Sequence, residues 1–403
     1  MQRTPKSSGR ATTSTMPLPA LGLFLSATLI SLSATPQTAT AAQTNAPEAP
    51  TSNIGVETVV SGLANPWGLE FLPDGRYLVT ERSGKLKIIS ADGASTITVT
   101  GVPKVRARGQ GGLMDITLSP DHAETGLLYL SYSEPTGSRK SRTAVARAKL
   151  DLAGTDAARL SDLQVIFQQT PAVSSGRHFG SRIVVANDGS LFITTGDRGN
   201  QQQSAQDPQT TIGVVARINS DGTPHKDNPK NAGWKPEIYS IGHRNIQGAA
   251  IDPDTGTLWT AEHGARGGDE LNKPEAGKNY GWPVITYGRD YSGAKIGVGQ
   301  KKDGFEQPVY YWDPSIATSG LEIVSGKQFS NWRGDILVGG LAGAQLSRLK
   351  LNNDRTSVVA EEVLLSGEGL RIREVREGPA GAIYVLVDER NGSLLKLTPR
   401  QPS

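Results

Sequence analysis

The residues best suited to chemistry lie in one window, 177–202, which reads RHFGSRIVVANDGSLFITTGDRGNQQ. We expect one strand around 191–193, with His178, Asp197 and Gln202 at its ends and in the flanking loops. A neutral imidazole whose tautomer is fixed by a carboxylate is the minimal equipment for taking a proton from an alcohol. The plainer alternatives are a structural histidine and an ordinary turn aspartate. The sequence has no cysteine, no nucleophile elbow and no zinc-type histidine cluster, so this pair is the leading catalytic candidate.

Two further segments offer cations to an oxygen-rich ligand. In 242–248, Arg244 stands beside Asn245 between glycines, and a guanidinium presents a fixed fork of donors to planar oxygens. A surface salt bridge is the alternative there. Arg371 and Arg373 point to the same side of an expected strand, because alternate residues share a face. Two guanidiniums on one face repel unless an anion joins them, which favours a ligand with several carboxylates.

The stretch 261–283 is rich in hard oxygen ligands, namely carboxylates, amide side chains and carbonyls beside glycines. Such ligands match Ca²⁺ better than a transition metal. The stretch has no EF-hand pattern, and acidic loops are commonly just solvated, so both interpretations stay open.

The elements that must position these residues are strands, because helical periodicity is nearly absent. A unit recurs in which a turn containing glycine leads into a short run of β-branched and aromatic residues. Its six copies begin at Pro73, Thr125, Asn187, Thr255, Arg333 and Ala380. Their spacing is long for a WD40 or kelch blade but accommodates four short strands plus loops. We therefore predict an all-β fold, a six-bladed β-propeller with long inter-strand loops over its central channel, rather than a β-helix or a pair of β-sandwiches.

The N-terminus has the pattern of a secretion signal: a basic start, an apolar stretch over 18–32 and small residues at 39–42. We predict a cleaved signal peptide over 1–42, a periplasmic location and no membrane span, since the apolar stretch is short for a bilayer. An uncleaved anchor is the alternative; a lipoprotein would need a cysteine. We expect 43–53 to be a disordered lead-in and 54–403 to be one propeller domain.

The formal net charge of +3 gives no reason to expect nucleic-acid binding. Arg3, Lys6 and Arg10 lie in the expected signal peptide, which has no acidic residue, so the rest of the chain is formally neutral. A neutral surface does not attract a phosphate backbone.

Together these residues resemble the soluble glucose/sorbosone dehydrogenase family, quinoproteins that use pyrroloquinoline quinone (PQQ), and most closely its aldose sugar dehydrogenase branch. The similarity runs over 62–397. It is carried by the 177–202 window and by short motifs, NPWG from Asn65, GQGGL from Gly109, RNIQG from Arg244, NYGWP from Asn279 and RIR from Arg371.

The resemblance implies oxidation of an aldose at its anomeric carbon to a lactone, with hydride transferred to PQQ. His178 would be the general base, Asp197 its orienting partner, and Arg244 the cation that polarises the quinone carbonyl.

The resemblance also implies which residues hold the cofactor. Gln110, Gln202 and Asn245 would be its hydrogen-bonding neighbours, while Arg371 and Arg373 would pair with its carboxylates.

Calcium and an external electron acceptor are implied too. The carbonyls of Gly264 and Ala265 would bind a Ca²⁺ that also holds PQQ, and Glu270 with the Tyr280 carbonyl would form a second, structural site. Electrons would pass to a quinone or a periplasmic redox carrier, and the enzyme would be a monomer or homodimer. In one departure from glucose-oxidising relatives, Ala342 stands where they carry a lysine for a PQQ carboxylate.

Two other classes of protein fit part of the pattern. A Ca²⁺-dependent lactonase or other hydrolase propeller would place acids around a channel metal, but it has no use for Arg371 and Arg373. A noncatalytic sugar- or protein-binding propeller would tolerate the loss of His178.

Overall fold

The computed structural model describes residues 42–154 and 156–400. Apart from Ala42, the expected signal peptide lies outside the described residues. The described part forms 24 strands, one short helix, α1 (His122–Thr125), and two 3-10 helices, η1 (Gln202–Gln206) and η2 (Ser330–Trp332). Among these described residues, no helix is long and apolar enough to cross a membrane.

The strands form six antiparallel four-stranded sheets, here called blades 1 to 6. Blade 1 contains β2 (Pro66–Phe71), β3 (Tyr77–Glu81), β4 (Lys85–Ile89) and β5 (Thr96–Val99). Blade 2 contains β6 (Leu113–Leu118), β7 (Leu127–Thr136), β8 (Lys140–Ala153) and β9 (Ala157–Gln168). Blade 3 contains β10 (Gly180–Val185), β11 (Leu191–Thr195), β12 (Val214–Ile218) and β13 (Ile238–Ile241). Blade 4 contains β14 (Ile246–Ile251), β15 (Leu258–Glu262), β16 (Asp269–Asn272) and β17 (Tyr310–Trp312). Blade 5 contains β18 (Thr318–Ile323), β19 (Ile336–Gly340), β20 (Gln345–Leu351) and β21 (Val358–Leu364). Blade 6 contains β22 (Ile372–Glu377), β23 (Ile383–Val387), β24 (Gly392–Pro399) and β1 (Ile54–Leu63).

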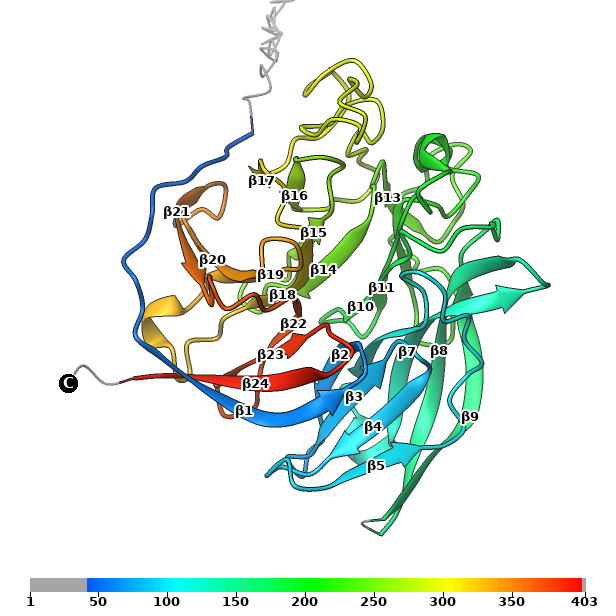
Figure 1. Cartoon of the computed structure of the whole chain (residues 1–403). Coiled ribbons are helices and arrows are strands. Elements are labelled where there is room, and N and C mark those ends of the chain that lie inside the picture. The colour runs from blue at the N-terminus through cyan, green and yellow to red at the C-terminus, as the bar shows by residue number, and fades with distance from the viewer. Residues whose placement is uncertain (1–41, 155, 401–403) are drawn as a thin grey trace, which may run out of the picture. The chain divides into compact units, whose positions relative to one another are not determined.

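The six blades are arranged around one central axis (Figure 1). The first strands of successive blades contact one another, and β22 of blade 6 contacts β2 of blade 1, so the ring closes. This confirms the six-bladed β-propeller predicted from the repeats. Each predicted repeat begins at the turn between the first and second strands of one blade, where glycines such as Gly75 (φ +86°) and Gly189 (φ +80°) supply the left-handed backbone that the turn needs.

The ring is closed by the N-terminal strand, which the sequence did not reveal. β1 pairs antiparallel with β24, so blade 6 combines strands from both ends of the propeller. Leu63 of β1 is buried in a cluster that includes Leu69 of blade 1 and Leu394 of blade 6. Pairing with this strand satisfies the backbone N–H and C=O groups that the edge of β24 would otherwise leave unpaired.

The prediction of a disordered lead-in at 43–53 is wrong. Gln43 and Glu48 form β-bridges with Tyr310 and Glu361, and the hydroxyl of Ser52 donates a hydrogen bond of 2.9 Å to Glu362. The composition suggested disorder, but the backbone and side-chain groups of this segment find partners on blades 4 and 5.

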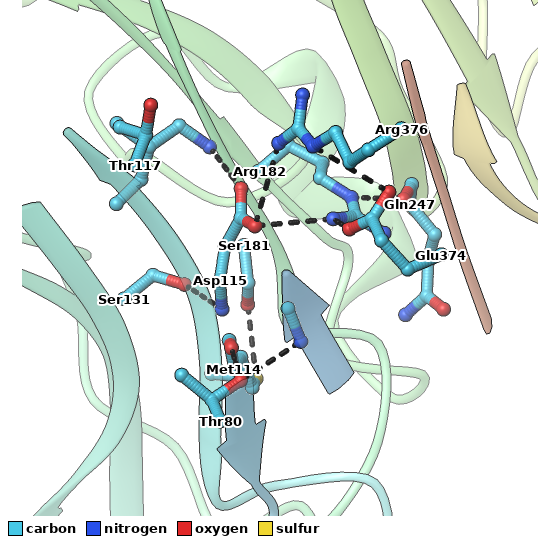
Figure 2. Close-up of polar contacts among 12 residues, drawn as sticks. Thr80, Met114, Asp115, Thr117, Ser131, Ser181, Arg182, Gln247, Glu374 and Arg376 are labelled. Carbon is cyan, nitrogen blue, oxygen red and sulfur yellow. Dashed lines mark hydrogen bonds and ion pairs between the residues drawn. The ribbon is translucent and has the colours of Figure 1, made fainter. Parts of the chain in front are cut away.

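Buried charges occupy the axis between the innermost strands (Figure 2). Arg182 of β10 pairs with Asp115 of β6 at 3.1 Å and with Glu374 of β22, and its Nε donates to the carbonyl of Gln247 in β14 at 2.5 Å. All three charged side chains are at most 1% exposed. Removing one partner of such a buried group costs on the order of 3–5 kcal/mol, so this cluster fixes four blades relative to one another.

Candidate active site

His178 and Asp197 meet because they flank a hairpin. The window has two strands where we expected one: β10 and β11 pair antiparallel with Gly180 opposite Thr195, which brings His178, two residues before β10, close to Asp197, two residues after β11. Gly180 has φ +65°, and any side chain on it would overlap the backbone of Thr195. Only glycine permits this approach.

The two side chains form a tightly held pair. His178 Nδ1 lies 2.6 Å from Asp197 Oδ1. The other carboxylate oxygen, Oδ2, accepts a hydrogen bond of 2.8 Å from the indole N–H of Trp282, and the backbone N–H of His178 donates to Gln110 Oε1 at 2.7 Å. His178 itself adopts φ +54°, a conformation that costs energy for a non-glycine residue and is common at functional sites.

The electrostatics of the pair suit a base. Burial lowers the pKa of His178, and the nearby Arg244 charge adds to this, although the hydrogen bond to Asp197 opposes it. Burial works against ionisation of Asp197, but the hydrogen bond and charge of His178, together with Arg244, hold the pKa of this carboxyl below its usual range. At neutral pH the imidazole is therefore neutral, with Nδ1–H donated to a carboxylate and the Nε2 lone pair free to accept a proton.

Arg244 lies just before β14 and adjoins the pair. Its carbonyl accepts the N–H of Asp197 at 2.8 Å, and its guanidinium lies 5.2 Å from the centre of the Trp282 ring. Arg244 Nη1 donates to the carbonyl of His263 at 3.1 Å, whereas its Nε is buried with no partner. The next residue, Asn245, accepts the N–H of Gly180 at 3.1 Å and has a buried, unpartnered Nδ2.

A cavity of about 360 Å³, here called the axial pocket, is connected to these residues through two of its lining residues. Gln110 accepts the backbone N–H of His178, and the carbonyl of His263 accepts Arg244 Nη1. Its lining residues are Asn65, Trp67, Arg82, Gln110, Gln247, His263, Ala317, Leu341, Ala342, Arg371, Arg373 and Asp388. Three of these described lining residues are arginines and one, Asp388, is a carboxylate, so the wall carries excess positive charge.

The expected pairing of Arg371 and Arg373 on one face is present, since both line the axial pocket. For Arg373, however, the protein itself supplies an anion. Its Nη2 lies 2.8 Å from Asp388, and its Nη1 donates to the Gln247 side chain at 2.6 Å. Arg371 donates to the carbonyl of Leu341 at 2.9 Å and remains without a carboxylate among the recorded ion pairs of the described chain.

Three of the six predicted cofactor contacts, Gln110, Arg371 and Arg373, line the axial pocket. Arg244 and Asn245 do not line it, although the backbone of His263, which does, is hydrogen-bonded to both. Gln110 lines the axial pocket and links it to the backbone of His178. Gln202 instead begins η1, is exposed, and does not line this pocket.

The predicted calcium ligands lie beside the same pocket. Gly264 and Ala265 line a cavity of about 760 Å³ that shares His263 with the axial pocket. Glu270 and Tyr280 line a small cavity of about 10 Å³.

Glu270 shares that small cavity with Glu262. Burial and the neighbouring Glu262 charge raise the pKa of Glu270 well above its ordinary value. Among the described residues, no group of three His, Cys, Asp or Glu side chains could hold a metal, so any cation here needs backbone oxygens as well.

Sequence reasoning missed four residues of the site, namely Arg82, His263, Trp282 and Asp388. A positional signal could have found three of them. Arg82, His263 and Asp388 each directly follow the second strand of their blade, and this is where an antiparallel blade returns to the face on which its first strand began. Nothing in the spacing of the NYGWP motif indicated that Trp282 would reach Asp197.

Comparisons with known proteins agree with this geometry. The family model for glucose/sorbosone dehydrogenase matches residues 63–396. The chain is 42% identical over 354 residues to the aldose sugar dehydrogenase YliI of Escherichia coli (strain K12), an alignment that covers 87% of this chain and 94% of that relative.

Two solved structures show the same architecture. The apo form of the soluble aldose sugar dehydrogenase of Escherichia coli matches with a TM-score of 0.82 at 42% identity, over 86% of this chain and 100% of that one. The PQQ-bound form of an aldose sugar dehydrogenase from Streptomyces coelicolor matches with a TM-score of 0.70 at 29% identity, over 87% of this chain and 100% of that one.

Proposed function

Because the chain belongs to the glucose/sorbosone dehydrogenase family, we propose that it is a PQQ-dependent aldose sugar dehydrogenase that oxidises an aldose at the anomeric carbon to the lactone. The observation that carries this proposal is a neutral His178, fixed by Asp197 and linked through Gln110 to a pocket with excess positive charge.

The residues of the axial pocket fit PQQ, a flat molecule with several carboxylates and two quinone oxygens. Arg82, Arg371 and Arg373 face only one carboxylate of the described lining, Asp388. Close by, Arg244 Nε and Asn245 Nδ2 are buried donors with no partner, and such groups are rarely left unsatisfied unless something binds there. When bound, PQQ supplies a quinone that accepts the two electrons of the sugar oxidation.

The protein's part in the reaction is to take a proton and stabilise charge. His178 Nε2 accepts the proton of the anomeric hydroxyl, because Nδ1 is committed to Asp197. The carboxylate of Asp197 then stabilises the imidazolium. The hydrogen bond from the Trp282 N–H keeps this carboxylate from turning away from His178. Arg244 places a positive charge beside the pair, where negative charge on a bound quinone oxygen would develop.

Calcium is the second part of the proposal. The carbonyls of Gly264 and Ala265 would contribute two ligands, and Ca²⁺ takes about 6–8 oxygens, so the cofactor and water would complete the shell. A second Ca²⁺ would be held by Glu270 and the Tyr280 carbonyl. The crowding of Glu270 against Glu262 supports this, because a cation would relieve the repulsion between the two buried carboxyls.

We also propose a periplasmic location after cleavage of the signal peptide, with electrons passed to a quinone or a periplasmic redox carrier. This rests on the N-terminal pattern of the sequence.

The test is the absorption spectrum of the protein loaded with PQQ and Ca²⁺, recorded without oxygen before and after addition of an aldose. We expect conversion of the bound quinone to its reduced form, one sugar oxidised per cofactor. Bound PQQ that stays oxidised with a panel of aldoses would refute the proposal. Hydrolysis of a lactone by the cofactor-free protein would favour the lactonase class instead.

A further inference from the structure

We propose that the imidazole of His263 is a cofactor-binding residue, which forms a hydrogen bond to the group held in the axial pocket. This inference rests on the proposed function and adds a contact that the sequence did not single out.

The position of His263 places it where three cavities meet. It directly follows β15, and it lines the axial pocket, the 760 Å³ cavity beside Gly264 and Ala265, and the small cavity of Glu270. A molecule that contacts both Arg373 and the carbonyl of Ala265 must therefore pass this side chain.

The backbone of His263 fixes the ring in this place. Its N–H donates to the carbonyl of Asn245 at 3.1 Å, and its carbonyl accepts from Arg244 Nη1 at 3.1 Å. Both main-chain groups of His263 are thus bound to Arg244 and Asn245, two residues that we propose as cofactor contacts. The side chain has little freedom to leave the pocket wall.

The ring nitrogen Nε2 of His263 is buried and has no hydrogen-bond partner. The ring also makes a hydrogen bond to the backbone of Thr318, so Nε2 is the ring nitrogen that is left without a partner. Buried polar atoms are almost always satisfied by protein, water or ligand. An unpartnered nitrogen at the junction of three cavities fits a contact that forms when the cofactor binds.

Matched variants separate this contact from a packing role. His263→Leu keeps apolar bulk and loses the hydrogen bond, His263→Gln keeps a polar group of similar reach, and His263→Ala serves as a second truncation if the leucine variant does not fold. His122→Gln is the control, because His122 bonds to the carbonyl of Leu127 away from these cavities.

The measurement is the dissociation constant of PQQ, titrated with Ca²⁺ present and followed by the absorbance of the bound quinone. Losing one net hydrogen bond corresponds to about 3- to 10-fold weaker binding. We expect this for His263→Leu and His263→Ala, with His263→Gln and His122→Gln within about twofold of wild type. We also expect the absorption maximum of bound PQQ to shift in the leucine and alanine variants only.

Wild-type binding with an unchanged dissociation constant and spectrum in His263→Leu would overturn this inference alone. A wild-type protein that binds no PQQ would overturn the proposed function together with it.

Discussion

At the scale of single residues, the account depends on one imidazole whose surroundings favour its neutral form. His178 is about one-eighth exposed, with a side-chain exposure of 12%. Its strained backbone is held by the hydrogen bond to Gln110, and its tautomer by Asp197. The same burial that lowers the pKa of His178 makes the carboxylate contact strong.

The pH dependence of catalysis follows from this shift. Only neutral His178 can take a proton, and burial lowers its pKa below the ordinary value of about 6.5. As pH falls, kcat/KM should therefore stay level through 6.5 and decline only at lower pH, where His178 becomes protonated. Dye-linked sugar oxidation at saturating PQQ, measured across pH, gives the profile. An acid limb centred at or above 6.5 would show that the pKa of the essential base is not lowered.

At the scale of elements, the site is built by one repeated device. In each blade, the first strand begins and the second strand ends on the same face of the propeller. Residues at these two points line the axial pocket. Arg371 and Asp388 of blade 6 illustrate this, because the N–H of Asp388 donates to the carbonyl of Arg371 at 2.8 Å. In blade 1 the N–H of Arg82 donates to Asn65 in the same way, at 3.2 Å.

In blade 3, Gly196 allows a test of this close approach between the start of the first strand and the end of the second. It lies between β11 and Asp197, and a Cβ added there would overlap the carbonyl oxygen of His178. We expect Gly196→Ala to displace His178 from Asp197 and lower kcat by about 10²-fold, the usual cost of misplacing a catalytic group by about 1 Å. The contacts of Arg371 and Arg373 with the cofactor should persist, since both belong to another blade, and kcat is therefore compared at saturating PQQ.

The control for that variant is Gly55→Ala in β1, where an added Cβ meets only side-chain atoms of Thr398 and Arg400 at 3.3 Å. Equal kcat in both variants would mean that the close approach at Gly196 does not position the base.

The sequence was informative wherever a residue belonged to a regular element or to a short motif. Alternation placed Arg371, directly before β22, and Arg373 of β22 on the same wall of the axial pocket, and the turn glycines located all six hairpins. The sequence could not show that Gln202 lies outside the lining of the axial pocket, because it begins η1, a short loop element whose direction no periodicity encodes. Asp388 was missed because a lone aspartate after a strand looks like a turn residue until blade 6 brings it to Arg373.

At the scale of the whole molecule, the site exists only because the ring is closed. His178 belongs to blade 3, Arg244 to blade 4 and Arg371 to blade 6, and β1 from the start of the propeller completes blade 6. Pairing between strands from the two ends of the propeller leaves no signal in the local sequence. The contacts of the segment 43–53 with blades 4 and 5 are equally long-range, so its composition alone suggested disorder. The axial cluster around Arg182 then fixes the inner strands that carry the pocket (Figure 2).

The most direct test of the account is the single-turnover rate at which an aldose reduces bound PQQ, measured by stopped-flow absorbance in wild type and in His178→Ala at equal cofactor occupancy. Removing a general base typically slows a reaction by about 10²–10⁴-fold, and we predict a loss in this range with PQQ affinity retained. Reduction of the cofactor in His178→Ala at close to the wild-type rate would contradict the claim that this histidine takes the proton.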